Sequence, residues 1–338
     1  MAIEISALEA GTQLTQRGLL ADGERALRQA MAEAPGAPSP RRALAMNLLT
    51  QGRYAEAWPL YEARMEMPEL TDGVPRDFPF PRWRGEDISG KTLILFPEQG
   101  WGDQIQFVRF LPALRALGPR LILLVPPPLV RLFRHNFPDL DIRSAQGEID
   151  FPDPDYWSTL ADLPGRLGVT LEAIPQPPYL SPPGRWGGAP DGWKVGLATK
   201  GNPNYVLDAW RSLPDTLGER LLHHLPGQVF GLLPGATGAR DFADTAAVID
   251  GLDLVVAVDT AVGHLAGAMN KPCFLLVPGI GAGCGGARIP PGIPNTSSIA
   301  GRPTRAGMRR STRSSPTPIL YVSTGRAISP FAAWFPSR

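Results

Sequence analysis

The chain of 338 residues is long enough for two or three domains, and its hydrophobic share of 43% and charged share of 19% are ordinary for a globular protein. A formal charge of +1 gives no reason to expect a nucleic-acid or anionic-membrane partner. Two cysteines exclude a disulfide framework, no run of about 20 apolar residues predicts a membrane span, and the acidic start MAIEISALEAG is unlike a signal peptide. These features predict a soluble protein of the reducing cytoplasm.

The first 70 residues predict a helical arm. Alanine and leucine recur at helical spacing through Ala21–Ala34 and again through Ala43–Met65. Gly18 and Gly52 lie 34 residues apart, each ahead of an alanine-rich stretch, and a 34-residue period of paired helices is the tetratricopeptide signature. An ordinary helical hairpin is the alternative interpretation. In both cases we expect residues 1–70 to form a docking or packing surface.

A linker rich in proline and charge, residues 71–87, is followed by short apolar runs that alternate with helical stretches. The runs predicted as strands are Lys91–Phe96, Arg120–Val125, Trp193–Thr199, Gln228–Leu233, Leu252–Val258 and Cys273–Val277. Between the first two of them a helix is predicted over Asp103–Leu117. Strands that alternate with helices imply parallel sheets with crossover helices. A second linker at Ser181–Gly192 divides the series into two doubly wound lobes, residues 88–185 and 186–280, whose ligands are expected at the carboxyl ends of the strands.

The first group of candidate functional residues lies in PEQGWGDQIQF, residues 97–107, directly after the first predicted strand. Gly100 and Gly102 allow a tight turn and a close backbone approach to a ligand. Asp103 would lie near a helix N-terminus, where the dipole favours its ionised form, and an ionised carboxylate there can serve as a general base. The alternative is that Asp103 only caps the helix. Glu98 is a second carboxylate in reach of the same cleft.

The second group follows the predicted strand Leu252–Val258. Asp259 and Thr260 form a turn, and a helix of small residues is predicted from there through Asn270. Free N–H groups at the start of such a helix make an anion site. His264 shares a helix face with Thr260 and could add a hydrogen bond or a charge to a phosphate. In the alternative interpretation, Asp259 or Thr260 only caps the helix and His264 is a satisfied core residue.

The third group is the loop KGNPNYVLDAWRSLP, residues 200–214, at the carboxyl end of the strand Trp193–Thr199. Lys200 and Arg211 are candidates for neutralising a diphosphate, and Asn202 is a further candidate for ligand contact. Solvated surface charge is the alternative for the two cations. Nothing in the sequence resembles a nucleophile–His–acid triad, a P-loop or a zinc site.

Two long runs, PRWRGEDISGKTLILFPEQGWGDQIQFVRFLPAL and DFADTAAVIDGLDLVVAVDTAVGHLAGAMNKP, resemble the start of the catalytic region and the nucleotide-sugar motif of bacterial tetratricopeptide-repeat glycosyltransferase-like proteins. Both are similar to the family 9 glycosyltransferases, which include the ADP-heptose transferases of lipopolysaccharide synthesis, and more distantly to protein O-GlcNAc transferases. The resemblance covers residues 10–280 and implies an α/β fold of the GT-B type. Such a fold has two Rossmann-like lobes, and the nucleotide sugar binds mainly to the C-terminal one.

Carried over by motif, Asp103 matches the proposed catalytic base of this family. Asp259, Thr260 and His264 match the segment that binds the donor phosphates, and Ala261 stands where many relatives have glycine. The resemblance implies a nucleotide-sugar substrate, a saccharide or protein acceptor, and chemistry without a metal or cofactor. An acceptor hydroxyl would attack the anomeric carbon while helix-end N–H groups and cations stabilise the departing diphosphate. A non-catalytic scaffold with a protein partner on the arm, and a nucleotide-sugar epimerase, are the alternatives.

The tail, residues 281–338, differs from the rest of the chain. It has no Asp, Glu or Lys, whereas the density of acids in the first 280 residues predicts about 6.6 for this length. Arg, Pro, Ser and Gly occur eight times each. One interpretation is a disordered or low-complexity extension. The other is a frameshift near Gly281–Cys284, because a shifted frame from Arg288 onward permits Asp-Ser-Pro-Trp-Tyr-Pro, a segment that the resembling proteins carry.

Overall fold

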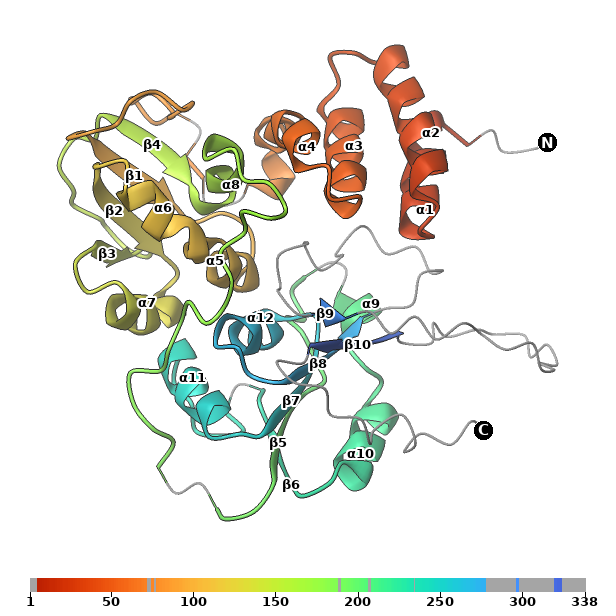
Figure 1. The fold of residues 1–338 in the computed structure, drawn as a ribbon, viewed down its shortest axis with the longest axis vertical. Helices are drawn as coiled ribbons and strands as arrows, with labels where there is room; N and C mark the ends of the chain where they lie inside the picture. The colour runs from red at the N-terminus through yellow and green to blue at the C-terminus, as the bar shows by residue number, and fades with distance from the viewer. Residues whose placement is uncertain are drawn as a thin grey trace.

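The computed structural model describes residues 5–71, 74–75, 77–187, 190–205, 208–233, 235–277, 296–297 and 319–323. They form a helical arm and two lobes that are each built around a sheet (Figure 1). The arm and the first lobe lie side by side, and the second lobe packs below the first in this view. The tail 281–338 and the frameshift predicted for it lie outside the described residues, except for two short strands.

The arm consists of four α-helices and two 3-10 turns: α1 (Ala7–Gln16), α2 (Leu20–Glu33), α3 (Pro38–Thr50), α4 (Tyr54–Tyr61), η1 (Glu62–Glu66) and η2 (Pro68–Leu70). Gly18 and Gly52 follow α1 and α3 with φ angles of 80° and 78°, in the left-handed region that glycine favours. Each glycine N–H and the N–H of the next residue bond back to carbonyls of the preceding helix, a Schellman cap. The repeated cap agrees with the 34-residue period, and the tetratricopeptide assignment stays a prediction.

The first lobe has a four-stranded parallel sheet in the order β3-β2-β1-β4. Its strands are β1 (Thr92–Phe96), β2 (Arg120–Val125), β3 (Asp141–Ser144) and β4 (Tyr156–Thr159). The helices and 3-10 turns between and after them are α5 (Trp101–Phe107), η3 (Val108–Phe110), α6 (Leu111–Arg115), η4 (Pro127–Leu129), α7 (Val130–Asn136), η5 (Leu160–Asp162) and α8 (Leu163–Arg166).

The helix predicted over Asp103–Leu117 is wrong as a single element. It is divided into α5, a 3-10 turn and α6, with Pro112 in the first turn of α6. Proline has no N–H to donate, and its ring clashes with the carbonyl four residues before it, so a continuous helix is disfavoured at this point.

The second lobe has a parallel core in the order β6-β5-β7-β8. Its elements are β5 (Lys194–Ala198), α9 (Asp208–Arg211), α10 (Asp215–His224), β6 (Gln228–Gly231), α11 (Phe242–Asp250), β7 (Leu254–Val258), α12 (Ala261–Ala268) and β8 (Cys273–Val277). Two further strands extend this sheet beyond β8. They are β10 (Ile319–Ser323), antiparallel to β8, and β9 (Thr296–Ser297), antiparallel to β10.

The two parallel sheets confirm the predicted α/β fold with two lobes, which is consistent with the GT-B type. Every predicted strand is present, with bounds that shift by at most two residues. The core strands are continuous apolar runs because both faces of each sheet are covered, and every residue of β7 is buried. In the first lobe, irregular segments that include Val74, Phe78 and Phe151 cover one of the two faces. The sequence missed β3 and β4, which are short and partly polar.

The segment predicted as the first linker, residues 71–87, packs against the first lobe where it is described. The indole of Trp83 is buried and donates to the carbonyl of Glu86 at 2.9 Å. The backbone of Trp83 donates to Trp157 in β4 at 2.8 Å, so the segment runs along the edge of the sheet. The domain boundaries themselves stay predictions. None of the helices in the described residues is both long and apolar enough to span a bilayer.

Candidate functional site

The loop after β1 presents Asp103 at the start of α5. Gly100 occupies the N-cap position, and Asp103 lies three residues later with Oδ2 accepting a hydrogen bond from the Gly100 N–H at 3.0 Å. The predicted capping role is therefore present. It uses one carboxylate oxygen, and Oδ1 has no hydrogen bond within the residues that the structure describes. Capping and a chemical role for Asp103 are compatible.

The loop after β7 presents the start of α12. Thr260 is the N-cap residue, with extended φ and ψ of −146° and 170°. Its hydroxyl donates to the carbonyl of Val258 at 3.1 Å and accepts no bond from the helix. A side-chain cap by Thr260 is thus wrong. The first-turn N–H groups of α12 have no intrahelical partner by helix geometry, so they can bind an anion.

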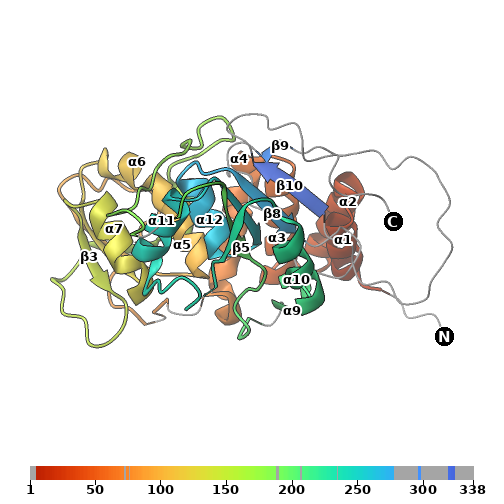
Figure 2. The same cartoon turned by 90° about the horizontal axis from the view of Figure 1, so that it is seen from below.

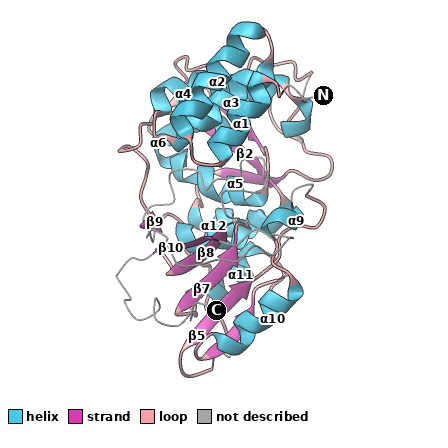
Figure 3. Ribbon diagram, turned by 90° about the vertical axis from the view of Figure 1, so that its right-hand side faces the viewer, coloured by secondary structure: helices cyan, strands magenta, loops and turns pink. Residues whose placement is uncertain are grey.

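These two loops meet between the lobes. α5 of the first lobe packs on α12 of the second, and the two helices lie together in all three views (Figures 1, 2 and 3). The two helices approach closely at Gly102, where an added Cβ would lie 2.6 Å from Cδ2 of His264. Only glycine at this position lets the helices approach so closely. Residues that are 162 positions apart in the chain are thereby brought into van der Waals contact.

The imidazole of His264 is not a satisfied core group. Its side chain is 11% exposed, and Nε2 lies 3.8 Å from Oδ1 of Asp259. Nδ1 is buried and has no hydrogen-bond partner among the described residues. An unpaired buried nitrogen loses its hydration without replacement, which is unfavourable unless something else binds there. The core interpretation of His264 is therefore wrong.

The electrostatic environment of Asp103 favours its protonated form. Burial raises the pKa of this half-buried carboxyl above its ordinary value, and the nearby carboxylates of Asp259 and Glu98 act in the same direction. The imidazole of His264 and the N–H of Gly100 act against them. A carboxylate with a raised pKa is a stronger base than one in water, and such groups gather at functional sites.

Only one cation of the third loop is directed toward these groups. Arg211 donates from Nη1 to the carbonyl of Asp259 at 3.1 Å and from Nε to Asp208 at 2.8 Å. Lys200 instead pairs with Asp215 at 2.6 Å and donates to a carbonyl of the loop.

Asn202 accepts a bond from the N–H of Asn204 at 3.0 Å, which shapes the turn. The structure thus gathers five predicted residues (Gly102, Asp103, Asp259, His264 and Arg211) at the junction of the lobes and directs Lys200 elsewhere.

Glu98 is not an acid or base in a cleft, contrary to the sequence-based expectation. It is 1% exposed, and the guanidinium of Arg64 binds it with Nε at 2.7 Å from Oε1 and Nη2 at 3.0 Å from Oε2. Thr159 donates to Oε2 at 2.6 Å. Arg64 comes from the arm and was not singled out in the sequence. The sequence feature that could have indicated its burial is that Arg64 is a lone arginine in a stretch rich in alanine and methionine.

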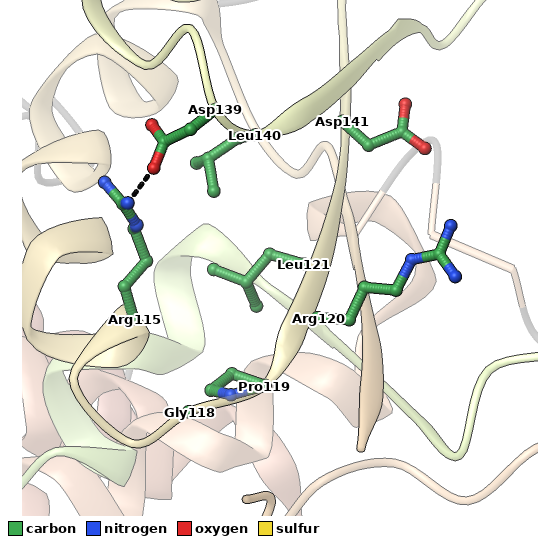
Figure 4. A pocket seen from close by; sticks show the side chains of 8 residues that line it. All are labelled: Arg115, Gly118, Pro119, Arg120, Leu121, Asp139, Leu140 and Asp141. Atoms are coloured by element: carbon green, nitrogen blue, oxygen red, sulfur yellow. Dashed lines mark hydrogen bonds and ion pairs between the residues drawn. The ribbon is translucent and has the colours of Figure 1, made fainter. Parts of the chain in front are cut away.

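A hollow of about 350 Å³ lies elsewhere, at the amino ends of β2 and β3 (Figure 4). Arg120 and Asp141, the first residues of these strands, line it, and Arg115 pairs with Asp139 across it. Ligands of parallel α/β sheets bind at the opposite, carboxyl edge, and the lining includes none of the predicted site residues. Across the described residues, no group of three or more His, Cys, Asp or Glu side chains is placed to hold a metal ion.

Comparison with known proteins connects the second lobe to a family of enzymes. Residues 218–276 match the model of glycosyltransferase family 9 (heptosyltransferase). Protein FlbA of Caulobacter vibrioides (strain ATCC 19089 / CIP 103742 / CB 15) is 32% identical over 313 residues, which cover 76% of this chain and 51% of FlbA. The chain spans about half the length of this curated relative. No solved structure matches. The second lobe thus carries a segment of the family 9 type, and the chain is a distant homologue of FlbA.

Proposed function

We propose that this protein is a glycosyltransferase that moves a sugar from a nucleotide-sugar donor to an acceptor hydroxyl. The observation that carries the proposal is the contact of Gly102 with His264, which sets a carboxylate from one lobe beside an anion-binding helix start from the other. The family 9 match of residues 218–276 supports the donor half, because it includes Asp259, Thr260, Ala261 and His264.

In the proposed reaction the donor diphosphate binds the first-turn N–H groups of α12. Arg211 and His264 lie beside this turn and can neutralise or bond the phosphates. The acceptor oxygen forms a bond to the anomeric carbon as the bond from that carbon to the diphosphate oxygen breaks. Asp103 takes the proton of the acceptor hydroxyl, and the electron pair of the broken bond leaves with the nucleoside diphosphate. The raised pKa of Asp103 suits this role as a base.

The acceptor is proposed more broadly, as a saccharide or a protein hydroxyl. The arm is available as a surface for a protein partner, since its helices α1 and α2 lie on the side away from the first lobe (Figure 1). The corresponding alternative is a scaffold that keeps the fold and binds a partner without turnover.

Donor binding discriminates between these functions. Isothermal titration of the full chain with UDP-, ADP- and GDP-sugars should show binding of one donor that Thr260→Ala and His264→Ala weaken. Arg41→Gln is the control, because Arg41 pairs with Glu66 in the arm and touches no residue of the site. Absence of binding to every donor would favour the non-catalytic scaffold over the transferase. Conversion of the donor sugar without an acceptor would indicate an epimerase.

Turnover tests the base. Asp103→Asn keeps an oxygen to accept the Gly100 N–H but cannot take a proton, so kcat should fall by about 10²- to 10⁴-fold while donor affinity is kept. Transfer at the wild-type rate in Asp103→Asn would remove Asp103 from the mechanism.

A further inference from the structure

A buried polar network joins the arm to the loop that carries Asp103. Arg64 lies in η1 of the arm, and its side chain is 1% exposed. Its guanidinium binds both oxygens of Glu98 and also the carboxylate of Asp162 after β4. Bidentate binding fixes the Glu98 carboxylate in orientation as well as in position. The two buried carboxylates hold the pKa of Arg64 well above its ordinary value, so the guanidinium stays charged.

The residue after Glu98 is held by the arm as well. Gln99 has a φ of 65°, in the left-handed region that side chains rarely adopt. Its amide donates from Nε2 to the hydroxyl of Tyr61 at 3.0 Å and to Oε1 of Glu98 at 3.1 Å. Tyr61 is the last residue of α4, and the Arg64 guanidinium lies over its ring at 4.5 Å. A costly backbone conformation is thus retained by contacts from the arm.

The loop then passes directly into the candidate site. Gln104 of α5 donates back to the carbonyl of Glu98, and the N–H of Gly100 donates to Asp103 at 3.0 Å. Every residue from Glu98 to Gly100 is therefore bound either to the arm or to α5. The turn that aims Asp103 at the second lobe has its conformation set from the arm side.

We infer that Tyr61 and Arg64 are positioning residues for Asp103. The arm would then fix the conformation of the turn before α5, in addition to offering a surface for partners. The inference rests on the proposed function for its catalytic consequence. The residues act through Gln99 and Glu98 and are not among the groups proposed to bind the donor or the acceptor. Loss of the Tyr61 hydroxyl should loosen the turn while the donor site, on α12 of the other lobe, is unchanged.

The test compares Tyr61→Phe with the full wild-type chain. Hydrogen exchange of the amides in residues 98–104 should become about 3- to 10-fold faster, the effect of losing one neutral hydrogen bond. Transfer should show kcat lower by a similar factor with the KM for the donor unchanged. Tyr179→Phe is the control, because it also removes a hydrogen-bonded tyrosine hydroxyl, one that accepts from Arg109 at 2.7 Å and does not touch the loop.

A double-mutant cycle assigns the effect to the single bond. Gln99→Asn tolerates the left-handed backbone but is too short to reach Tyr61. It removes the bond to Tyr61 together with the one to Glu98, so its effect should be at least that of Tyr61→Phe, and the double variant should add little to Gln99→Asn alone.

Unchanged exchange and unchanged kcat in Tyr61→Phe overturn the inference, and so does a change confined to the KM for the donor. If the wild-type chain binds no donor, the proposed function fails, and the exchange measurement alone still decides whether the arm holds the turn.

Discussion

A methyl group at position 102 would test the contact on which the candidate site depends. In Gly102→Ala the new Cβ would lie 2.6 Å from Cδ2 of His264 and 3.2 Å from Nε2. Carbon atoms in ordinary contact are about 3.5 to 4.0 Å apart, so the two helices must separate by about 1 Å or the imidazole must move.

The cost follows from the two ways of relieving this clash. Overpacking of a well-packed contact typically costs about 1–3 kcal/mol. If the imidazole and the helices stay in place, the free energy of unfolding falls by that amount. If the lobes separate instead, the free energy of unfolding changes less, but Asp103 withdraws from the proposed donor site. An increase of about 1–3 kcal/mol in the activation free energy then lowers kcat by about 5- to 150-fold.

Urea unfolding and sugar transfer should therefore be measured together on Gly102→Ala. Gly36→Ala is the control, since a Cβ there meets nothing within 4 Å and the backbone has no positive φ. In a His264→Ala background the methyl group has room, so the same substitution should cost less than about 0.5 kcal/mol. Wild-type stability together with wild-type turnover in Gly102→Ala, or equal costs in the two backgrounds, would refute the contact.

Four further predictions follow from the charged groups and the tail. Because burial raises the pKa of Asp103, the folded state holds its proton more tightly than the unfolded chain does. Ionisation of Asp103 therefore destabilises the fold as the pH rises through the folded pKa. Asp103→Asn should raise the urea midpoint at pH 8 and leave it unchanged at pH 3. Arg64→Gln removes the cation that pairs with Glu98 and one of the two that pair with Asp162, since Arg82 still binds Asp162, and it should cost about 3–5 kcal/mol. In the wild type the lowered pKa of Asp162 stabilises the fold at neutral pH, and this stabilisation is lost as the pH falls below about 4, which acid unfolding measures. Arg131 is half exposed and joins the lobes through Asp241 at 2.9 Å and Asp244 at 3.1 Å. Arg131→Ala should lower the free energy of unfolding by less than about 1 kcal/mol in thermal unfolding, and it should make the melting temperature less dependent on salt concentration. Sequencing of the coding DNA across codons 278–300 should reveal a shifted frame, and an intact frame shared with close relatives would contradict it.

The fold followed from the sequence because its strongest signals are periodic. The buried strands are short apolar runs with turn residues on either side, and each of the six predicted ones is present. The helix starts near Asp103 and after Thr260 could also be placed from the sequence, because helix starts depend on residues that are neighbours in the chain. Local chemistry is visible in a single sequence.

Contacts between distant residues were not visible in this way. The fit of Gly102 against His264 depends on how two lobes pack, and the capture of Glu98 by Arg64 depends on where the arm docks. Glu98 was therefore taken for a cleft carboxylate, although two donors from other elements occupy its oxygens. The same limit applies to Lys200, whose pairing with Asp215 depends on the path of the loop between them.

The division of the site between lobes has a consequence for what a family match can imply. Residues 218–276 include the helix start that can bind a diphosphate, but the carboxylate that would act on the acceptor comes from α5, and its turn is held from the arm. A second lobe alone could retain donor binding and have no base. Under the proposed function, binding and turnover are therefore separable: substitutions at the start of α12 should affect binding, and those at Tyr61 and Gln99 should affect turnover. Gly102→Ala, at the contact with His264, should affect turnover through the placement of both halves.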